Sequence, residues 1–496
     1  MNIFLIIIWI NFLFIISQIF IPFKTYNPLI TKDKYTLELI KNASDEILVN
    51  NILHNLIYVT IDLGKINNNV NCSSQKVDFF LSMKEFEFFM NIHPNQEQIF
   101  PDLNNKTFYP DLQYNNYYLL KHILNLSYYN PSLCESSFPG YISEKNNLVN
   151  NIANETINLI IKNNITKNKE NKEIQLFIPY KNEVKYDDRP GVLGLYFKNY
   201  FILNIKEKIP FNTNNWMLKY IDIFNEEGEL IIGGLPHEYD NAHFNEEQLR
   251  TSTVYIEGNM HPEWRLKFIK SYVVSNEKNS LNEYIINEHN IVSFNIEEFF
   301  ILGSDDYFNM IQKLFFKEYF NKGLCSKQTH KKSKYVSDYY HIICYFNGNK
   351  SEINSFLNNF PILKFYQSDM NYNFTLNATD LFTIIPDNNR VLFNVEFLEN
   401  YNNWVFGKPF FKKYQLIFDD DAKIIRYYIE KENNNYPSQK NNISNYIIII
   451  VILVLLTIFF ILGFYFSKFL FNKCYNKKKA LELDDDCLFE SKEDDQ

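Results

Sequence analysis

The sequence predicts a mainly β fold for a large region that lies between two apolar segments. Between about residues 51 and 433, short runs rich in Ile, Val, Phe and Tyr alternate with polar turns, which is the pattern of half-buried strands. Apolar residues make up 46% and charged residues 22% of the 496 residues, a composition that can bury a core. A chain of this length provides for two or three domains, or for one large two-lobed domain.

The expected strands are short apolar runs that end at polar or glycine-containing turns. The clearest helix covers residues 306–321, because Tyr307, Ile311 and Leu314 recur on one of its faces. Residues 163–173 are rich in Lys and Asn, which predicts an exposed loop. The strands are expected at 56–63, 77–81, 174–179, 230–234, 253–256, 266–274, 416–418 and 424–429.

The first apolar segment opens the chain. Residues 3–20 contain three polar side chains and end just before Pro22, which is typical of the hydrophobic region of a signal peptide. We therefore assign residues 1–21 to an export signal. No Lys or Arg precedes the segment and no small-x-small cleavage site follows it, so an uncleaved signal anchor is the alternative.

The second apolar segment lies near the C-terminus, at residues 446–467. At about 1.5 Å rise per residue, a helix of this length crosses a hydrocarbon core about 30 Å thick. Five lysines follow between residues 468 and 479, and such clusters stay on the cytoplasmic side. The sequence thus predicts a linker at 433–445, a helix in the lipid bilayer and a cytoplasmic tail at 468–496.

This topology is that of a single-pass type I membrane glycoprotein of the secretory or endosomal system or the cell surface, with a lumenal or extracellular ectodomain. Cys72, Cys134, Cys325 and Cys344 fall in that ectodomain, where an oxidising compartment favours disulfides. Four cysteines permit three pairings. Ten Asn-x-Ser/Thr sequons fit export, although many arise by chance in a chain this rich in Asn. They begin at Asn42, Asn71, Asn105, Asn125, Asn154, Asn164, Asn349, Asn373, Asn377 and Asn442.

Composition and motifs exclude several other classes of function. The formal net charge is −9, which provides no basic surface for nucleic acid, and no nucleic-acid-binding motif occurs. The nine His show no metal-ligand spacing. We therefore predict no metal site, no cofactor and no nucleic-acid partner.

The most specific pattern closes the ectodomain. Trp404 and Gly407 are followed by Phe410, Tyr414 and the pair Phe418-Asp419, in the spacing W-x-x-G-x-x-F-x-x-x-Y-x-x-x-F-D. This pattern resembles the closing signature of the pepsin-like aspartic peptidases (peptidase A1). Further segments resemble the motifs of that family in the same order along the chain. They are residues 58–64, 75–77, 190–195, 228–234, 264–266 and 374–380.

The resemblance implies two β-rich lobes around a central cleft, with the N-terminal lobe at 51–225 and the C-terminal lobe at 226–432. Cys325 and Cys344 stand where the family has its C-terminal-lobe disulfide, which leaves Cys72 and Cys134 as the second expected pair.

The resemblance also shows what is missing. The family uses two Asp, one from each lobe in a D-T-G or D-S-G turn, which share one proton. Neither motif occurs in this chain, and Ser82 and Asn295 stand at the two positions. Neither side chain ionises near neutral pH to serve as a general base. We therefore expect an inactive receptor or scaffold that holds an extended peptide or protein in its cleft, with Ser82 and Asn295 hydrogen-bonded to each other.

Two alternatives remain open. Glu85 and Glu87 lie near the first turn and Glu297 and Glu298 near the second, so displaced carboxylates define a divergent active endopeptidase. The plainer interpretation of these four residues is solvated loop charge. Tyr141 stands at the tyrosine of the family's flap, but the glycines after it are replaced. A glycosylated surface protein whose cleft binds nothing is the second alternative.

Overall fold

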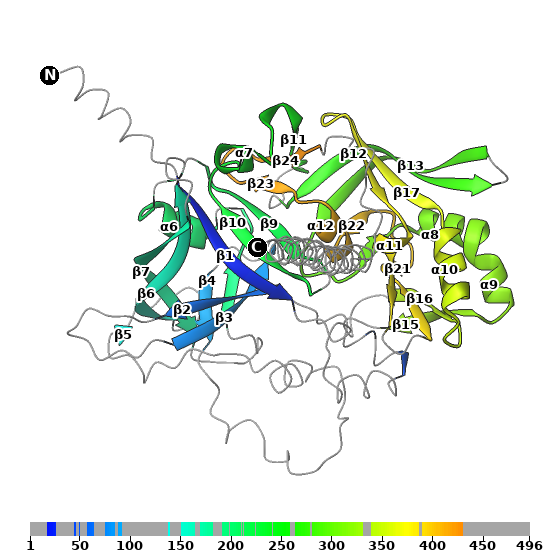
Figure 1. Ribbon diagram of the computed structural model, residues 1–496, viewed down its shortest axis with the longest axis horizontal. Helices are drawn as coiled ribbons and strands as arrows, with labels where there is room; N and C mark the ends of the chain where they lie inside the picture. Colours follow the sequence, from blue (N-terminus) through cyan, green and yellow to red (C-terminus); the bar gives the residue numbers. More distant parts are fainter. Residues whose placement is uncertain are drawn as a thin grey trace, which may run out of the picture. The chain divides into compact units, whose positions relative to one another are not determined.

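The structure is a computed structural model, and it shows a mainly β protein (Figure 1). All described residues belong to one compact unit that ends at Ile429. They are residues 17–25, 44–45, 49, 57–63, 75–84, 88–91, 137–138, 150–163, 169–181, 191–197, 199–209, 211, 213–223, 225–240, 242–257, 263–277, 280–330, 339–385 and 389–429.

The first of two sheets has thirteen strands among the described residues. Its order is β11-β24-β23-β9-β10-β1-β2-β3-β8-β4-β7-β6-β5. The sheet therefore combines strands from both ends of the chain. The strands are β1 (Ser17–Thr25), β2 (Ile57–Leu63), β3 (Gln75–Ser82), β4 (Phe88–Asn91), β5 (Ser137–Phe138), β6 (Asn150–Asn163), β7 (Lys169–Lys181), β8 (Gly191–Gly194), β9 (Asn215–Asp222), β10 (Glu227–Ile232), β11 (Leu249–Thr253), β23 (Ile417–Asp419) and β24 (Ile424–Tyr428).

The second sheet has eleven strands within the same described ranges, in the order β18-β17-β12-β13-β22-β14-β21-β16-β20-β19, with β15 paired to β16. The strands are β12 (Arg265–Glu277), β13 (Ser280–Phe294), β14 (Ile301–Gly303), β15 (Cys325–His330), β16 (Tyr339–Tyr345), β17 (Ile362–Gln367), β18 (Tyr372–Leu376), β19 (Phe382–Ile384), β20 (Arg390–Phe393), β21 (Val395–Leu398) and β22 (Trp404–Phe406).

The helices are short and accompany both sheets. The predicted helix at 306–321 is confirmed as a continuous helical stretch made of α8, a π-helical segment and α9. Its buried face includes Tyr307 and Ile311, as the periodicity predicts. The helices are α6 (Tyr200–Lys206), α7 (Pro236–Tyr239), α8 (Asp305–Ile311), the π-helical Gln312–Phe316, α9 (Lys317–Asn321), α10 (Lys350–Asn358), α11 (Ala378–Leu381) and α12 (Lys408–Lys413).

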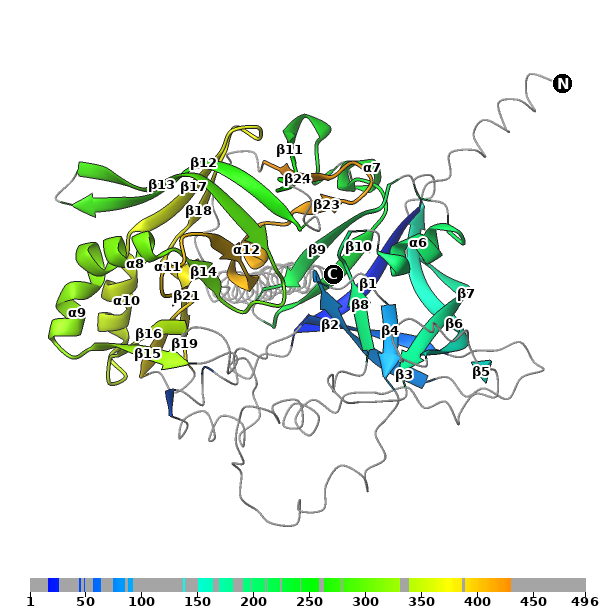
Figure 2. The same ribbon diagram turned by 180° about the vertical axis from the view of Figure 1, so that it is seen from behind.

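The two sheets contain the same local arrangement of strands, and this duplication defines two lobes. In the N-terminal lobe, β3 pairs in parallel with β8, which pairs antiparallel with β4, which runs parallel to β7. In the C-terminal lobe, β13 pairs in parallel with β22, which pairs antiparallel with β14, which runs parallel to β21. Figure 2 shows β3, β8 and β4 next to one another. Both β3 and β13 are the second strand of an antiparallel hairpin.

Strand β1, dark blue in Figure 1, places the start of the chain in the first sheet. Ile19 pairs with Ile232 of β10, and Phe23 pairs with Val59 of β2. Both Ile19 and Phe23 are buried. The strand begins inside residues 1–21, so a processed protein that keeps β1 has to be cut before Ser17. The N-terminal lobe also starts earlier than residue 51, because β1 is one of its core strands.

Two expectations about local structure are wrong. Residues 169–173 are not loop but the start of β7, because they pair with 158–162 of β6 and leave mostly polar side chains exposed. The strand expected at 253–256 is instead β11, which ends at Thr253, where its partner β24 begins at Ile424. The apolar pattern of the sequence does not reveal the start of β7 or the end of β11, because pairing with the partner strand determines both boundaries.

The disulfide expected in the C-terminal lobe is confirmed. Cys325 and Cys344 lie opposite each other on β15 and β16 and are bonded. Cys72, Cys134, Tyr141 and residues 430–496, with the apolar segment 446–467, lie outside the described residues. Within the part of the chain that the structure describes, no helix has the length and apolarity needed to cross a membrane.

Candidate functional site

Two turns with equivalent positions in the two lobes form the candidate site. Ser82 is the last residue of β3 and pairs with Gly194 of β8. Asn295 directly follows β13, and its backbone N–H donates to the carbonyl of Phe406 on β22 at 3.0 Å. Ser82 and Asn295 are 0% and 5% exposed. The lobe duplication thus brings these two sequence-predicted residues to matching places.

The turns after Ser82 and Asn295 are also built alike. The backbone N–H of Lys84 donates to Ser82 Oγ at 3.2 Å, and the backbone N–H of Glu297 donates to Asn295 Oδ1 at 3.1 Å. In each turn the first side chain therefore accepts a hydrogen bond from the third residue. The third residue is where a D-T-G motif has glycine, so Lys84 and Glu297 bring long charged side chains into this region.

These side chains make contacts from one lobe to the other. The Ser82 hydroxyl donates to Glu297 Oε1 at 2.6 Å, and Lys84 Nζ lies 3.6 Å from Glu298 Oε1. The side chain of Lys84 is 62% exposed and that of Glu298 is 24% exposed, so solvent weakens this ion pair. The bond between Ser82 and Glu297 is charge-assisted, which makes it the stronger contact.

The direct bond expected between Ser82 and Asn295 is replaced by these contacts. Asn295 Nδ2 donates to Glu298 Oε1 at 3.3 Å, within its own turn. Glu297 and Glu298 are both partly buried, so the interpretation as fully solvated loop charge does not fit them. Glu85 and Glu87 lie outside the described residues. Sequence reasoning missed Lys84, although its place as the third residue of the turn was a signal.

In each lobe, the residues that follow β8 or β22 donate backbone hydrogen bonds to the turn. The backbone N–H of Leu195 donates to the Ser82 carbonyl at 2.6 Å, and that of Lys408 donates to the Glu298 carbonyl at 2.9 Å. Trp264, at the start of the second sheet, donates from Nε1 to the Leu195 carbonyl at 3.1 Å. The backbone at Ser82 is thus connected to the C-terminal lobe through a buried indole.

The arrangement determines what the site can do chemically. Among the residues that the structure describes, the carboxylates of the site are Glu297 and Glu298, which are neighbours on one turn of the C-terminal lobe. Glu297 Oε1 accepts a hydrogen bond from the Ser82 hydroxyl, and Lys84 Nζ forms an ion pair with Glu298 Oε1. In the described parts of the chain, no group of three or more His, Cys, Asp or Glu side chains is placed to hold a metal ion.

The contact between Ser82 and Glu297 can be measured with a double-mutant cycle. We expect Ser82→Ala and Glu297→Ala to be coupled by about 1–2 kcal/mol in the free energy of unfolding, because each single change removes the same charge-assisted bond. Urea unfolding of the wild type, both single variants and the double variant measures this coupling.

Ser82→Ala combined with Lys322→Ala provides the control, because Lys322 is an exposed residue of the C-terminal lobe. That pair should be additive. Additivity of the Ser82 and Glu297 variants would show that the bond between them does not stabilise the fold.

Comparison with known proteins adds little to this geometry. No protein-family model matches the chain, and no curated protein matches it. Among solved structures, the crystal structure of basic 7S globulin from soybean is similar, with a TM-score of 0.48, 9% sequence identity, and coverage of 83% of this chain and 95% of that chain. A similarity this distant does not support conclusions about this protein. The two-lobed arrangement is therefore inferred from the strand order and register of this chain alone.

Proposed function

We propose that this protein is a membrane-anchored, aspartic-peptidase-like ectodomain that is catalytically inactive and binds an extended peptide or protein. One observation carries the proposal: Ser82 and Asn295 occupy equivalent turn positions in the two lobes, and by the sequence resemblance these are the positions of the family's catalytic Asp. The sequence pattern that ends at Asp419 and the duplicated strand arrangement support the same class.

The chemistry of the two turns explains the expected inactivity. An aspartic peptidase needs one ionised and one protonated carboxyl, held together so that they share a proton and activate water. Here one lobe contributes a hydroxyl at that position and the other an amide. The side chain of Glu297 lies against Ser82 at 2.6 Å, in the region where the family's turn has no side chain.

Binding by this ectodomain would use the backbone of its β-rich lobes. An extended peptide gains affinity through strand-like hydrogen bonds and specificity through pockets for alternate side chains, and neither requires a catalytic carboxylate. Anchoring is supported by the apolar segment 446–467 and the lysines that follow it. In this proposal, the peptide binds on the lumenal or extracellular side of the membrane.

A peptide-display screen on the full chain in nanodiscs tests binding. We expect nanodiscs that contain the protein to retain more extended peptides than empty nanodiscs do. We also expect Glu297→Ala to change the affinity of the protein for the retained peptides at least about fivefold. Lys322→Ala is the matched control and should leave the affinity unchanged. Absence of enrichment would favour a surface protein whose cleft binds nothing.

A divergent active endopeptidase is the second candidate function. The observation that favours it is the position of Glu297 and Glu298, because both carboxylates lie beside the turn residues Ser82 and Asn295. In that case Glu297→Gln should abolish peptide cleavage and leave the fold intact, since Gln keeps the size and an acceptor oxygen.

A further inference from the structure

A short part of the connection between β1 and β2 contacts the C-terminal lobe. Within residues 26–56 the structure describes Ser44, Asp45 and Val49. Asp45 and Val49 are both helical, and residues four apart in a helix lie on the same face. Asp45 bonds to strands of the second sheet, and Val49 packs in a cluster that includes two of them, whereas β1 and β2 belong to the first sheet. This connection therefore joins the two lobes.

Asp45 is held by polar side chains from three strands. Arg390 of β20 has its Nη1 atom 3.3 Å from Asp45 Oδ1. Gln328 of β15 donates from Nε2 to Asp45 Oδ2 at 3.3 Å, and the Tyr345 hydroxyl of β16 donates to the same oxygen. The side chains of Arg390 and Asp45 are 7% and 12% exposed, so solvent screens this ion pair less than a surface pair. Gln328, Tyr345 and Arg390 thus form a polar socket that fits a carboxylate.

Val49 occupies an apolar socket beside the polar one. It is 0% exposed, and Tyr345, which donates to Asp45, packs against the same apolar cluster. A side chain of this size and apolarity suits such a place, whereas a polar one would lose its hydration there. The other members of the cluster, which form the apolar socket, are Phe299, Phe300, Ile343, Ile385 and Leu392.

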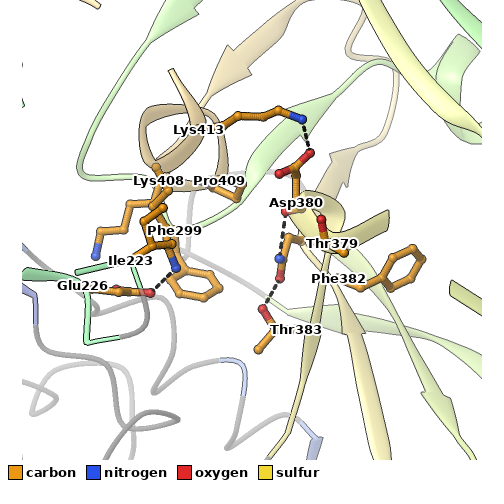
Figure 3. Close-up of a pocket in the computed structure, with 12 residues that line it drawn as sticks. Ile223, Glu226, Phe299, Thr379, Asp380, Phe382, Thr383, Lys408, Pro409 and Lys413 are labelled. Atoms are coloured by element: carbon orange, nitrogen blue, oxygen red, sulfur yellow. Dashed lines mark hydrogen bonds and ion pairs between the residues drawn. The ribbon is translucent and has the colours of Figure 1, made fainter. Parts of the chain in front are cut away.

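The apolar socket is connected to the candidate site through the chain. Phe299 and Phe300 directly follow Glu297 and Glu298. Phe299 also lines a cavity of about 300 Å³ beside α12 (Figure 3). The cavity leaves free volume on one side of the Phe299 ring, so packing within the cluster is what holds the ring in place. Val49 therefore helps to fix the backbone next to the turn that carries Glu297.

We propose that the C-terminal lobe has a docking site for a helical motif with a carboxylate and, four residues later, a small aliphatic side chain. Its occupant is the chain's own pair Asp45 and Val49, which we call the clasp. The clasp fastens the connection between β1 and β2 to the C-terminal lobe, and it positions the turn that carries Glu297.

A peptide added in trans tests the docking site. A fluorescent peptide of residues 40–54 is titrated into the full chain in nanodiscs. In the unmodified chain the tethered clasp competes with the peptide, at an effective concentration of about 1 mM for a flexible connection. The variant Asp45→Asn/Val49→Ala weakens this competition, so we expect it to bind the peptide at least about fivefold more tightly. A peptide with the same two changes is the matched control and should bind neither protein.

Hydrogen exchange tests the effect of the clasp on the turn. The backbone N–H of Asn295 donates to the Phe406 carbonyl, and that of Glu298 donates to the Asn295 carbonyl. In the Asp45→Asn/Val49→Ala variant we expect the amides of residues 295–298 to exchange at least about fivefold faster. Mass spectrometry of the exchanged chain measures this rate.

Val274→Ala is the matched control for the exchange experiment. Val274 is buried, and it pairs with Ile362 toward the far end of β12 from Arg265, which pairs with Ser293 just before the turn. Its replacement removes the same two methyl groups as Val49→Ala and should leave the exchange of residues 295–298 unchanged.

Each result decides part of the proposal. Equal peptide binding by the unmodified chain and the variant, or equal binding of the control peptide, would overturn the docking site. Unchanged exchange of the turn, or equal acceleration by Val274→Ala, would overturn the positioning role. If the double variant does not fold, Asp45→Asn alone replaces it, because Asn keeps the shape of Asp and removes the charge. None of these outcomes depends on whether the protein binds or cleaves other peptides.

Discussion

Replacing Gly407 with alanine is expected to lower the free energy of unfolding by about 3 kcal/mol or more. A Cβ atom at this position would lie 2.1 Å from the carbonyl oxygen of Phe300 and 2.5 Å from that of Glu298. Both are backbone atoms, and neither can move without displacing the turn that carries Asn295. Gly407 is therefore required because the late strand approaches this turn closely.

Gly323→Ala provides the comparison for Gly407→Ala. Gly323 has a φ of +67°, but a Cβ atom there meets nothing within 4 Å. Its replacement should cost about 1 kcal/mol through backbone strain. Urea unfolding of both variants measures the difference. If Gly407→Ala were no more destabilising than Gly323→Ala, the claim that a side chain at residue 407 clashes with the backbone of the turn would be contradicted.

The second large effect is expected at Trp264, which connects the lobes. Its indole N–H donates to the Leu195 carbonyl at 3.1 Å, and its ring stacks on Phe197 with 4.0 Å between centroids. Edge contacts join it to Trp216 and Phe418, and it is buried. Trp264→Ala should lower the free energy of unfolding by about 3–5 kcal/mol through the cavity and the lost bond.

Trp264→Phe separates the two contributions. It keeps an aromatic ring and loses the N–H, so we expect a smaller loss of about 1–3 kcal/mol from the unpaired Leu195 carbonyl and the reduced volume. Urea unfolding monitored by circular dichroism measures both variants. A loss below about 1 kcal/mol for Trp264→Ala would contradict the role of this residue as a connection between the lobes.

Local patterns predicted much of the C-terminal lobe. The spacing from Trp404 to Asp419 corresponds to β22, α12 and β23, because large aromatic side chains at those intervals have to be buried together. The helical stretch at 306–321 followed from one apolar face. In contrast, β1 was not predicted, because it begins inside residues 1–21, and a buried strand and a signal segment are both continuous apolar runs.

The candidate site was predictable in part. Motif order placed Ser82 and Asn295 at the two turns, and the structure gives them equivalent backbone environments. The bond from Ser82 to Glu297 could not be predicted, because it joins residues 215 positions apart and depends on how long side chains cross between lobes. The burial of Lys408 also had no sequence signal, since a lysine in an amphipathic segment normally faces solvent.

Peptidase activity of the full-length protein is the most direct test of the central claim that this site is inactive. The full chain is needed, because a protein that starts at residue 51 lacks β1. We would incubate it with a peptide library from about pH 3 to pH 7, with and without a statine-type inhibitor of aspartic peptidases. We predict no inhibitor-sensitive cleavage by the folded protein. Inhibitor-sensitive cleavage that disappears in Glu297→Gln would contradict this account and establish displaced carboxylates as the catalytic groups.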